Sequence, residues 1–99
     1  MQSKIDRQSV IKASSSQVSC RLGEETVVLQ VDSGRYMGMD PVSTTIWEFI
    51  QQPRSFHELE AYLLEEYDVT PERCEADLLE VLEELLESGL IEVMNARPS

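Results

Sequence analysis

The chain has few of the residues that build catalytic or metal sites. His57 is its only histidine, and its two cysteines, Cys20 and Cys74, lie far apart. One histidine and two separated thiols cannot supply the four ligands of a zinc site. Nothing beside either thiol indicates an activated nucleophile, and no glycine-rich loop could hold a phosphate. We therefore expect no enzyme activity, no catalytic residue, no metal and no cofactor.

Long hydrophobic runs are also missing. No segment approaches the roughly 18 apolar residues of a membrane span, and the polar start of the chain has no secretory signal. We expect a cytoplasmic protein that does not enter a membrane. Disulfides are uncommon in that compartment, so two buried free thiols are the favoured interpretation of Cys20 and Cys74. The sequence alone does not exclude a disulfide between them.

Positive charge is scarce. The chain has 8 Lys and Arg against 19 Asp and Glu, which gives a net charge of −11. Most of the acidic excess follows residue 55. An acidic surface repels the phosphate backbone that a nucleic-acid-binding protein must attract. We expect no nucleic-acid partner.

The composition predicts one domain. The chain has 99 residues, of which 41% are hydrophobic, enough for one modest core. Residues 1–17 are polar and are expected to form a flexible N-terminal arm, in which 10–13 are a candidate short strand. Residues 18–93 are the expected domain, and 94–99 the tail.

Three strands are predicted at close spacing, over residues 18–22, 26–31 and 35–39. In the first, apolar and polar residues alternate, which is typical of a half-buried strand and places Cys20 in the core. Short turns join the three strands. They predict an antiparallel meander in which the first and third strands are the edges.

Three helices follow, each with its own start signal. Asp40 before Pro41 predicts the first helix. A capping box at residues 55–58 predicts the second. The third is predicted over 71–88, on whose apolar side Cys74 lies, with a stop at Gly89.

The order of the elements predicts an α+β fold of winged helix-turn-helix type. Its three-stranded antiparallel sheet comes first, three helices follow, and residues 90–93 form a short C-terminal strand or a strap across the core. The second and third helices would be the helix-turn-helix pair. A fold does not establish a function. A DNA-binding regulator remains a remote alternative because the third helix is acidic.

The third helix is more apolar than a simple surface helix. Its apolar residues cover an arc of roughly 160°, against the ~100° that a surface helix needs. One interpretation is that this helix packs against both other helices and the sheet. The other is that its flank near Leu78 and Val81 lines a groove beside the sheet edge. Both can hold for different residues.

Three segments resemble the PqqD-like family of precursor-recognition domains from pathways that modify ribosomally made peptides. They read YMGMDPVSTTIWEFI, PRSFHELEAYLLEEYDV and TPERCEADLLEVLEELLESGLIEV. The resemblance covers roughly residues 18–93. The small free-standing form looks most like the stand-alone recognition proteins of lasso-peptide clusters. Ser43 departs from the pattern, since many relatives carry glycine near this position.

The resemblance implies that the domain binds the leader of a precursor peptide by strand addition. The leader would pair antiparallel with residues 35–39 and rest against the third helix. The domain would then present the precursor to a separate leader peptidase and a macrocyclase, as in lasso-peptide maturation. An unpaired strand edge is a template for another strand, which supports this mode of binding.

Hydrogen bonds along the edge are not sufficient for binding. Each contributes a net ~0.5–1.5 kcal/mol, whereas association costs about 4–15 kcal/mol. Leader side chains must therefore enter apolar pockets. The candidate peptide-binding residues are Arg35, Tyr36, Met37, Gly38, Met39, Cys74, Asp77, Leu78, Val81, Glu84 and Leu85.

For Tyr36, Met37, Met39, Leu78, Val81 and Leu85 a place in the core is the competing interpretation. Gly38 either allows close approach of a backbone or relieves crowding beside Trp47. Two further classes of function stay open. The domain could carry a peptide in another modified-peptide or quinone-cofactor pathway, or it could be a structural module whose strand edge pairs with a second copy.

Overall fold

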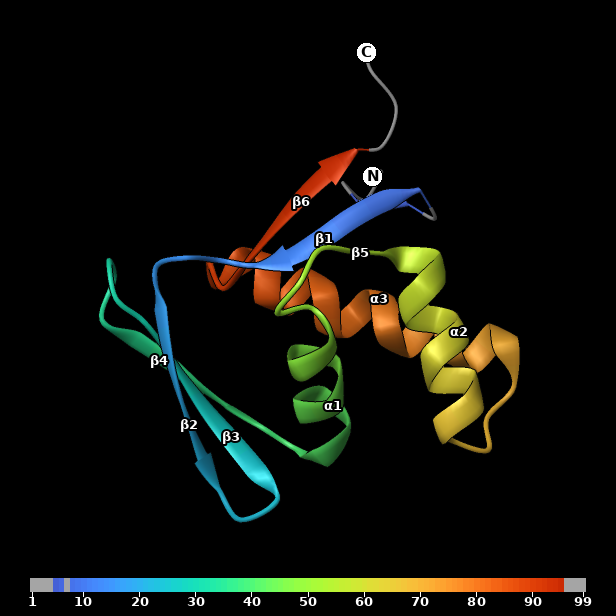
Figure 1. Cartoon of the computed structure of the whole chain (residues 1–99), viewed down its shortest axis with the longest axis horizontal. Helices are drawn as coiled ribbons and strands as arrows, with labels where there is room; N and C mark the ends of the chain where they lie inside the picture. Colours follow the sequence, from blue (N-terminus) through green and yellow to red (C-terminus); the bar gives the residue numbers. More distant parts are fainter. Residues whose placement is uncertain (1–4, 7, 96–99) are drawn as a thin grey trace.

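A computed structural model of the protein describes residues 5, 6 and 8–95 (Figure 1). It contains two antiparallel sheets of three strands each and three helices. The elements, in chain order, are β1 (Ser9–Ala13), β2 (Gln17–Leu22), β3 (Glu25–Gln30), β4 (Arg35–Met39), α1 (Pro41–Phe49), β5 (Arg54–Ser55), α2 (Phe56–Glu66), α3 (Pro71–Glu87) and β6 (Ile91–Asn95). The predicted α+β class is confirmed.

The first sheet is the predicted meander, with strand order β2-β3-β4. Val28 of β3 lies opposite Ser19 on one side and Met37 on the other. These paired residues share a face, which we call the inner face because Val28 and Met39 are buried in the core with residues of α1. β2 and β4 are the edges of this sheet, as expected.

The second sheet has the order β5-β1-β6 and was not predicted as a sheet. The candidate strand in the arm is present as β1, and the predicted C-terminal stretch is a strand, β6, rather than a strap, although it begins at residue 91 and not 90. Ile11 of β1 is fully buried. β1 is therefore part of the fold, because pairing on both sides and a buried side chain hold it. The domain boundaries given above stay a prediction.

The helix boundaries follow from their capping residues. A side-chain oxygen of Asp40 accepts a hydrogen bond from the Ser43 N–H at 2.8 Å, and the predicted capping box of α2 is complete. The backbone N–H of Ser55 donates to the Glu58 carboxylate, which lowers the pKa of Glu58. Gly89, at φ +74°, ends α3 in a Schellman motif.

The core lies between the helices and the two sheets, and one predicted core residue is misplaced. Cys74 is buried as expected, but Cys20 is exposed and both thiols are free. β2 turns Cys20 to the outer face of its sheet, away from α1, so the prediction for Cys20 was wrong. Among the described residues, no helix is long and apolar enough to cross a membrane.

The place of β1 in the core can be tested by truncating Ile11. We expect Ile11→Ala to lower the free energy of unfolding by about 2–5 kcal/mol, because it leaves a cavity. Val18→Ala is the control, since Val18 is 59% exposed, and should change stability by less than about 0.5 kcal/mol. Urea denaturation followed by circular dichroism measures both. If Ile11→Ala changed the free energy of unfolding as little as Val18→Ala does, β1 would not be part of the core.

Candidate functional site

The candidate site is built around β4. In the described part of the chain β4 pairs only with β3, so its second edge carries unpaired backbone groups. Met37 and Met39 point to the inner face, and Met39 is only 2% exposed. Tyr36 and Gly38 point to the outer face, where Tyr36 is 77% exposed. The core thus holds β4 in place while its edge stays open.

An apolar cavity of about 150 Å³ lies near the C-terminal end of β4. Val42 in the first turn of α1 comes three residues after β4 ends. The cavity also reaches α2, the α2–α3 link and the N-terminal half of α3. Its lining residues are Val42, Ile46, Leu63, Tyr67, Val69, Cys74, Asp77, Leu78 and Val81. Asp77 is the one ionised side chain in this wall.

Hydrogen bonds fix the walls of this cavity. The hydroxyls of Thr45 and Tyr67 lie 3.1 Å apart and join α1 to the α2–α3 link. The Cys74 thiol donates to the carbonyl oxygen of Glu60 at 3.9 Å. Burial raises the pKa of the Cys74 thiol, and the carboxylates of Glu60 and Asp77 raise it further. The thiol is therefore neutral at physiological pH and acts as an apolar wall, not as a nucleophile.

A polar depression lies at the opposite end of β4. It is lined by Gln30, Asp32, Ser33, Arg35, Glu87, Ser88 and Gly89. Arg35 is the first residue of β4, whereas Glu87 is the last residue of α3. The two ends of the β4 edge therefore differ in chemistry. The Val42 end is apolar, and the Arg35 end is polar and charged.

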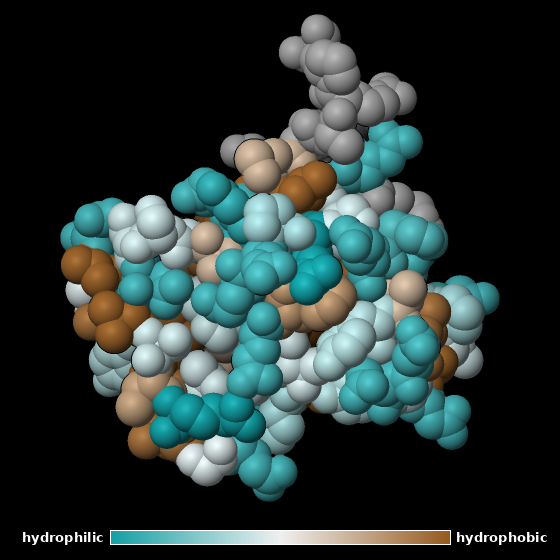
Figure 2. Space-filling view, in the orientation of Figure 1, coloured by the Kyte–Doolittle hydropathy of each residue, from teal (hydrophilic) through white to brown (hydrophobic). Residues whose placement is uncertain are grey.

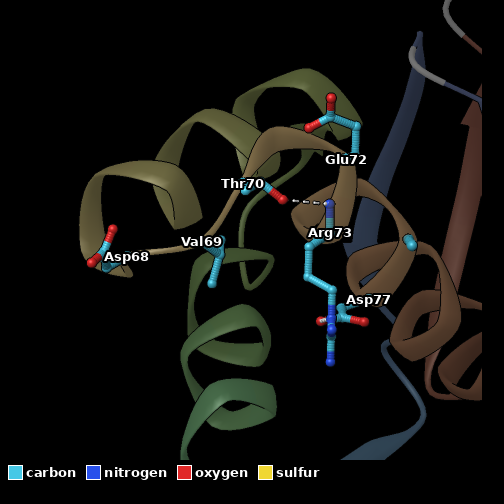
Figure 3. Close-up of a pocket in the computed structure, with 7 residues that line it drawn as sticks. Asp68, Val69, Thr70, Glu72, Arg73 and Asp77 are labelled. Carbon is cyan, nitrogen blue, oxygen red and sulfur yellow. Dashed lines mark hydrogen bonds and ion pairs between the residues drawn. The ribbon is translucent and has the colours of Figure 1, made fainter.

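A third depression lies beside the start of α3 (Figure 3). It shares Val69 and Asp77 with the apolar cavity. Arg73 donates to the Asp77 carboxylate at 3.1 Å, and its backbone N–H donates to the Thr70 hydroxyl. Arg73 and Asp77 pair with each other, but Asp68 and Glu72 also line this depression, so its wall is net acidic.

The structure brings part of the predicted site together. Cys74, Asp77, Leu78 and Val81 line the apolar cavity. Leu85 is only 1% exposed and belongs to the core. Leu78 and Met39 are also buried in the core. Glu84 is exposed and lines neither the apolar cavity nor either of the two depressions. Both interpretations of α3 apply, to different residues. Leu85 packs in the core, whereas Val81 lines the apolar cavity.

Gly38 does not relieve crowding beside Trp47. A Cβ atom built on Gly38 would meet nothing within 4 Å, since this residue faces outward. That interpretation was wrong, and close approach of a backbone stays a prediction.

Sequence reasoning missed five residues of the apolar cavity. Val42, Ile46, Leu63, Tyr67 and Val69 were not among the candidate peptide-binding residues. Val42 and Val69 are each 42% exposed, which is high for valine. The only sequence signal was a valine in the link, Val69, directly before the α3 cap. Within the described residues, no group of three side chains could hold a metal ion.

The fold and the family agree. The chain has a small α+β fold with an open strand edge beside an apolar cavity. Residues 25–91 match the family described as "Coenzyme PQQ synthesis protein D (PqqD)". The chain belongs to this family.

Two solved structures share the fold. One is titled "TbiB1 in Complex with the TbiA(beta) Leader Peptide". It is 28% identical, with a TM-score of 0.77, over 89% of this chain and 99% of that one. The other, "Lasso peptide synthetase B1 complexed with the leader peptide", is 20% identical, with a TM-score of 0.73, over 83% and 96%. None of the curated proteins matches the chain.

The two thiols should differ in reactivity. We expect iodoacetamide to modify exposed Cys20 at least about tenfold faster than buried Cys74 near pH 8, because the raised pKa of Cys74 leaves less thiolate. Mass spectrometry over time measures both sites in one sample, so Cys20 is the internal control. Equal rates of modification at the two thiols would contradict the burial of Cys74 in the cavity wall.

Proposed function

We propose that this protein binds the leader segment of a ribosomally made precursor peptide by strand addition at β4. One observation carries the proposal: the open edge of β4 ends three residues before Val42, which lines a preformed apolar cavity. An added strand gains backbone hydrogen bonds, and the cavity supplies the side-chain burial that these bonds alone cannot replace. The 28% identical relative was solved with a leader peptide, which supports this choice of ligand.

Three other strand edges in the described chain are less suited. β2 is the opposite edge of the first sheet, and β5 and β6 are the two edges of the second. None of these strands contributes a residue to the polar depression, as β4 does with Arg35, and none is followed within three residues by a residue of the apolar cavity, as β4 is by Val42. A peptide on those edges would gain hydrogen bonds without anchors. β4 is the edge where both kinds of interaction are available.

The geometry sets an order of side chains along the leader. β4 runs from the polar depression at Arg35 toward the apolar cavity near Val42. A leader strand antiparallel to β4 runs the opposite way. Its apolar anchors then lie toward its N-terminus, in the cavity. About five residues later, at ~3.4 Å per residue, its polar side chains reach Arg35 and Glu87.

The biological role is recruitment in lasso-peptide maturation. The protein holds the leader, and a separate leader peptidase and macrocyclase act on the attached precursor. Binding to one protein raises the effective concentration of the precursor near these enzymes. No bond chemistry is assigned to this chain.

Val81 tests the cavity. We expect Val81→Glu to weaken leader binding by at least about tenfold, because a carboxylate would be buried beside Asp77 without a partner. Fluorescence anisotropy of a labelled leader peptide measures the Kd. Val31→Glu is the matched control, since Val31 is 54% exposed and lies outside the cavity. Equal loss in both variants, or none in either, would contradict the assignment.

Backbone methylation of the leader tests strand addition separately. In an antiparallel pair, alternate N–H groups of one strand point to its partner. We expect N-methylation at successive leader positions to weaken binding at every second residue of the paired segment, measured by the same anisotropy titration. A uniform effect, or none, would show that the leader does not add as a strand.

A further inference from the structure

The two depressions and the apolar cavity follow one another along α3. The depression beside the start of α3 is lined by helix residues between 72 and 77, the cavity by residues between 74 and 81, and the polar depression by the last residue, Glu87. β4 runs the other way, since Arg35 at its start lines the polar depression and Val42, just after its end, lines the cavity. A leader strand antiparallel to β4 therefore runs in the direction of α3. Its residues before the apolar anchors reach the depression at the start of this helix.

The wall of this first depression is acidic, and we call it the acidic depression. Asp68, Glu72 and Asp77 line it, with Arg73 as the one basic residue. Arg73 pairs with Asp77. Within the described residues the carboxylates of Asp68 and Glu72 have no hydrogen-bond or ion-pair partner, and Figure 3 shows them on opposite sides of Val69. Two carboxylates are therefore available to a ligand.

The dipole of α3 does not reverse this charge. A helix N-terminus carries roughly half a positive charge. Three carboxylates against one guanidinium and that half charge leave an excess of about one and a half negative charges. The acidic depression therefore favours a cation over an anion.

Exposed carboxylates alone identify no ligand, because most of them only face solvent. Here the acidic depression shares Val69 and Asp77 with the apolar cavity. Val42 and Val69 are each 42% exposed, so the cavity opens to solvent with uncovered apolar side chains. At the right margin, where Figure 1 places the end of α2 and the start of α3, Figure 2 shows hydrophobic surface bordered by hydrophilic side chains. An apolar opening beside an acidic wall fits a peptide segment that carries apolar and basic side chains in succession.

We infer that the leader carries lysine or arginine shortly before its apolar anchors, and that Asp68 and Glu72 bind these basic side chains. The inference rests on the proposed function, because it assigns a further part of the same ligand. Glu72 and Val81 are nine residues apart on α3, which is about 14 Å at 1.5 Å per residue. An extended peptide covers this distance in about four residues. The basic side chains therefore lie within about four residues on the N-terminal side of the first anchor.

The charge of the whole chain acts in the same direction. A net charge of −11 attracts a cationic segment before contact. Salt screens such attraction between exposed charges, with a Debye length of about 10 Å at 0.1 M and about 3 Å at 1 M. The basic residues should therefore contribute most at low salt, whereas the apolar anchors should not depend on salt in this way.

A series of leader peptides tests the pairing. The probe is the labelled leader peptide of the pathway, and its first anchor is the most N-terminal residue whose replacement by alanine raises the Kd at least about fivefold. Lysine, alanine or glutamate is then placed at each of the four positions before this anchor. We expect the lysine peptide to bind at least about threefold more tightly than the glutamate peptide at one or more of these positions, measured by fluorescence anisotropy in low salt.

The chain offers a matched control for the acidic depression. The double variant Asp68→Asn with Glu72→Gln should bring the lysine and glutamate peptides within about 1.5-fold of each other. Glu24→Gln with Glu83→Gln removes the same charge from exposed residues outside the depression, and should keep at least about half of the lysine preference on a logarithmic scale. Circular dichroism confirms folding of both double variants.

The inference and the proposed function fail in different ways. Absence of leader binding by the unaltered chain overturns both. Leader binding without a lysine preference at any of the four positions overturns the inference alone. So does an equal loss of the preference in the two double variants, or a preference that about 1 M NaCl does not reduce, because the ion pairs would then not be those of the exposed Asp68 and Glu72.

Discussion

The burial of Met39 is the constraint on which the rest of the site depends. This residue ends β4, is only 2% exposed, and its carbonyl accepts a hydrogen bond from the Thr44 hydroxyl of α1 at 3.4 Å. Asp40 follows at once and caps α1. One junction therefore fixes which face of β4 meets the core and where α1 begins. With the face fixed, the strand can leave one edge open without rotating into the interior.

In the proposed mode of binding, specificity and affinity come from different parts of this arrangement. Backbone hydrogen bonds at the β4 edge accept many sequences, since every residue except proline offers the same groups. The cavity lined by Val42 and Val81 and the polar end at Arg35 are where we propose that leader side chains are distinguished. The neutral thiol of Cys74 keeps the cavity apolar. The first sheet thus offers an open edge, at which we propose that the peptide binds.

The elements of the domain could be predicted because their signals are local. The caps at Asp40, Ser55 and Thr70 define the helix starts, and short turns define the meander. The second sheet could not be predicted, because β1 pairs with β6 about eighty residues later, and no local pattern encodes that contact. Cys20 was misplaced for a related reason. Alternation shows that a strand has two faces, but only tertiary packing decides which one is buried.

The candidate site was predicted in part for the same reasons. The edge strand and the α3 residues Cys74, Leu78 and Val81 came from the pattern and the family resemblance. The other walls of the cavity come from α1, α2 and their link, which meet only in the folded chain. Tyr36 and Gly38 were also predicted as binding residues because they share β4 with Met37, yet they face outward, away from the core.

Hydrogen–deuterium exchange of the full chain, with and without leader peptide, tests the central claim most directly. The amides of β4 that do not bond to β3 should gain protection when the leader binds, because an added strand would accept their hydrogens. The amides of β2 and β6 should not change. Protection at residues 17–22 or 91–95 in place of 35–39 would contradict the claim that β4 receives the peptide.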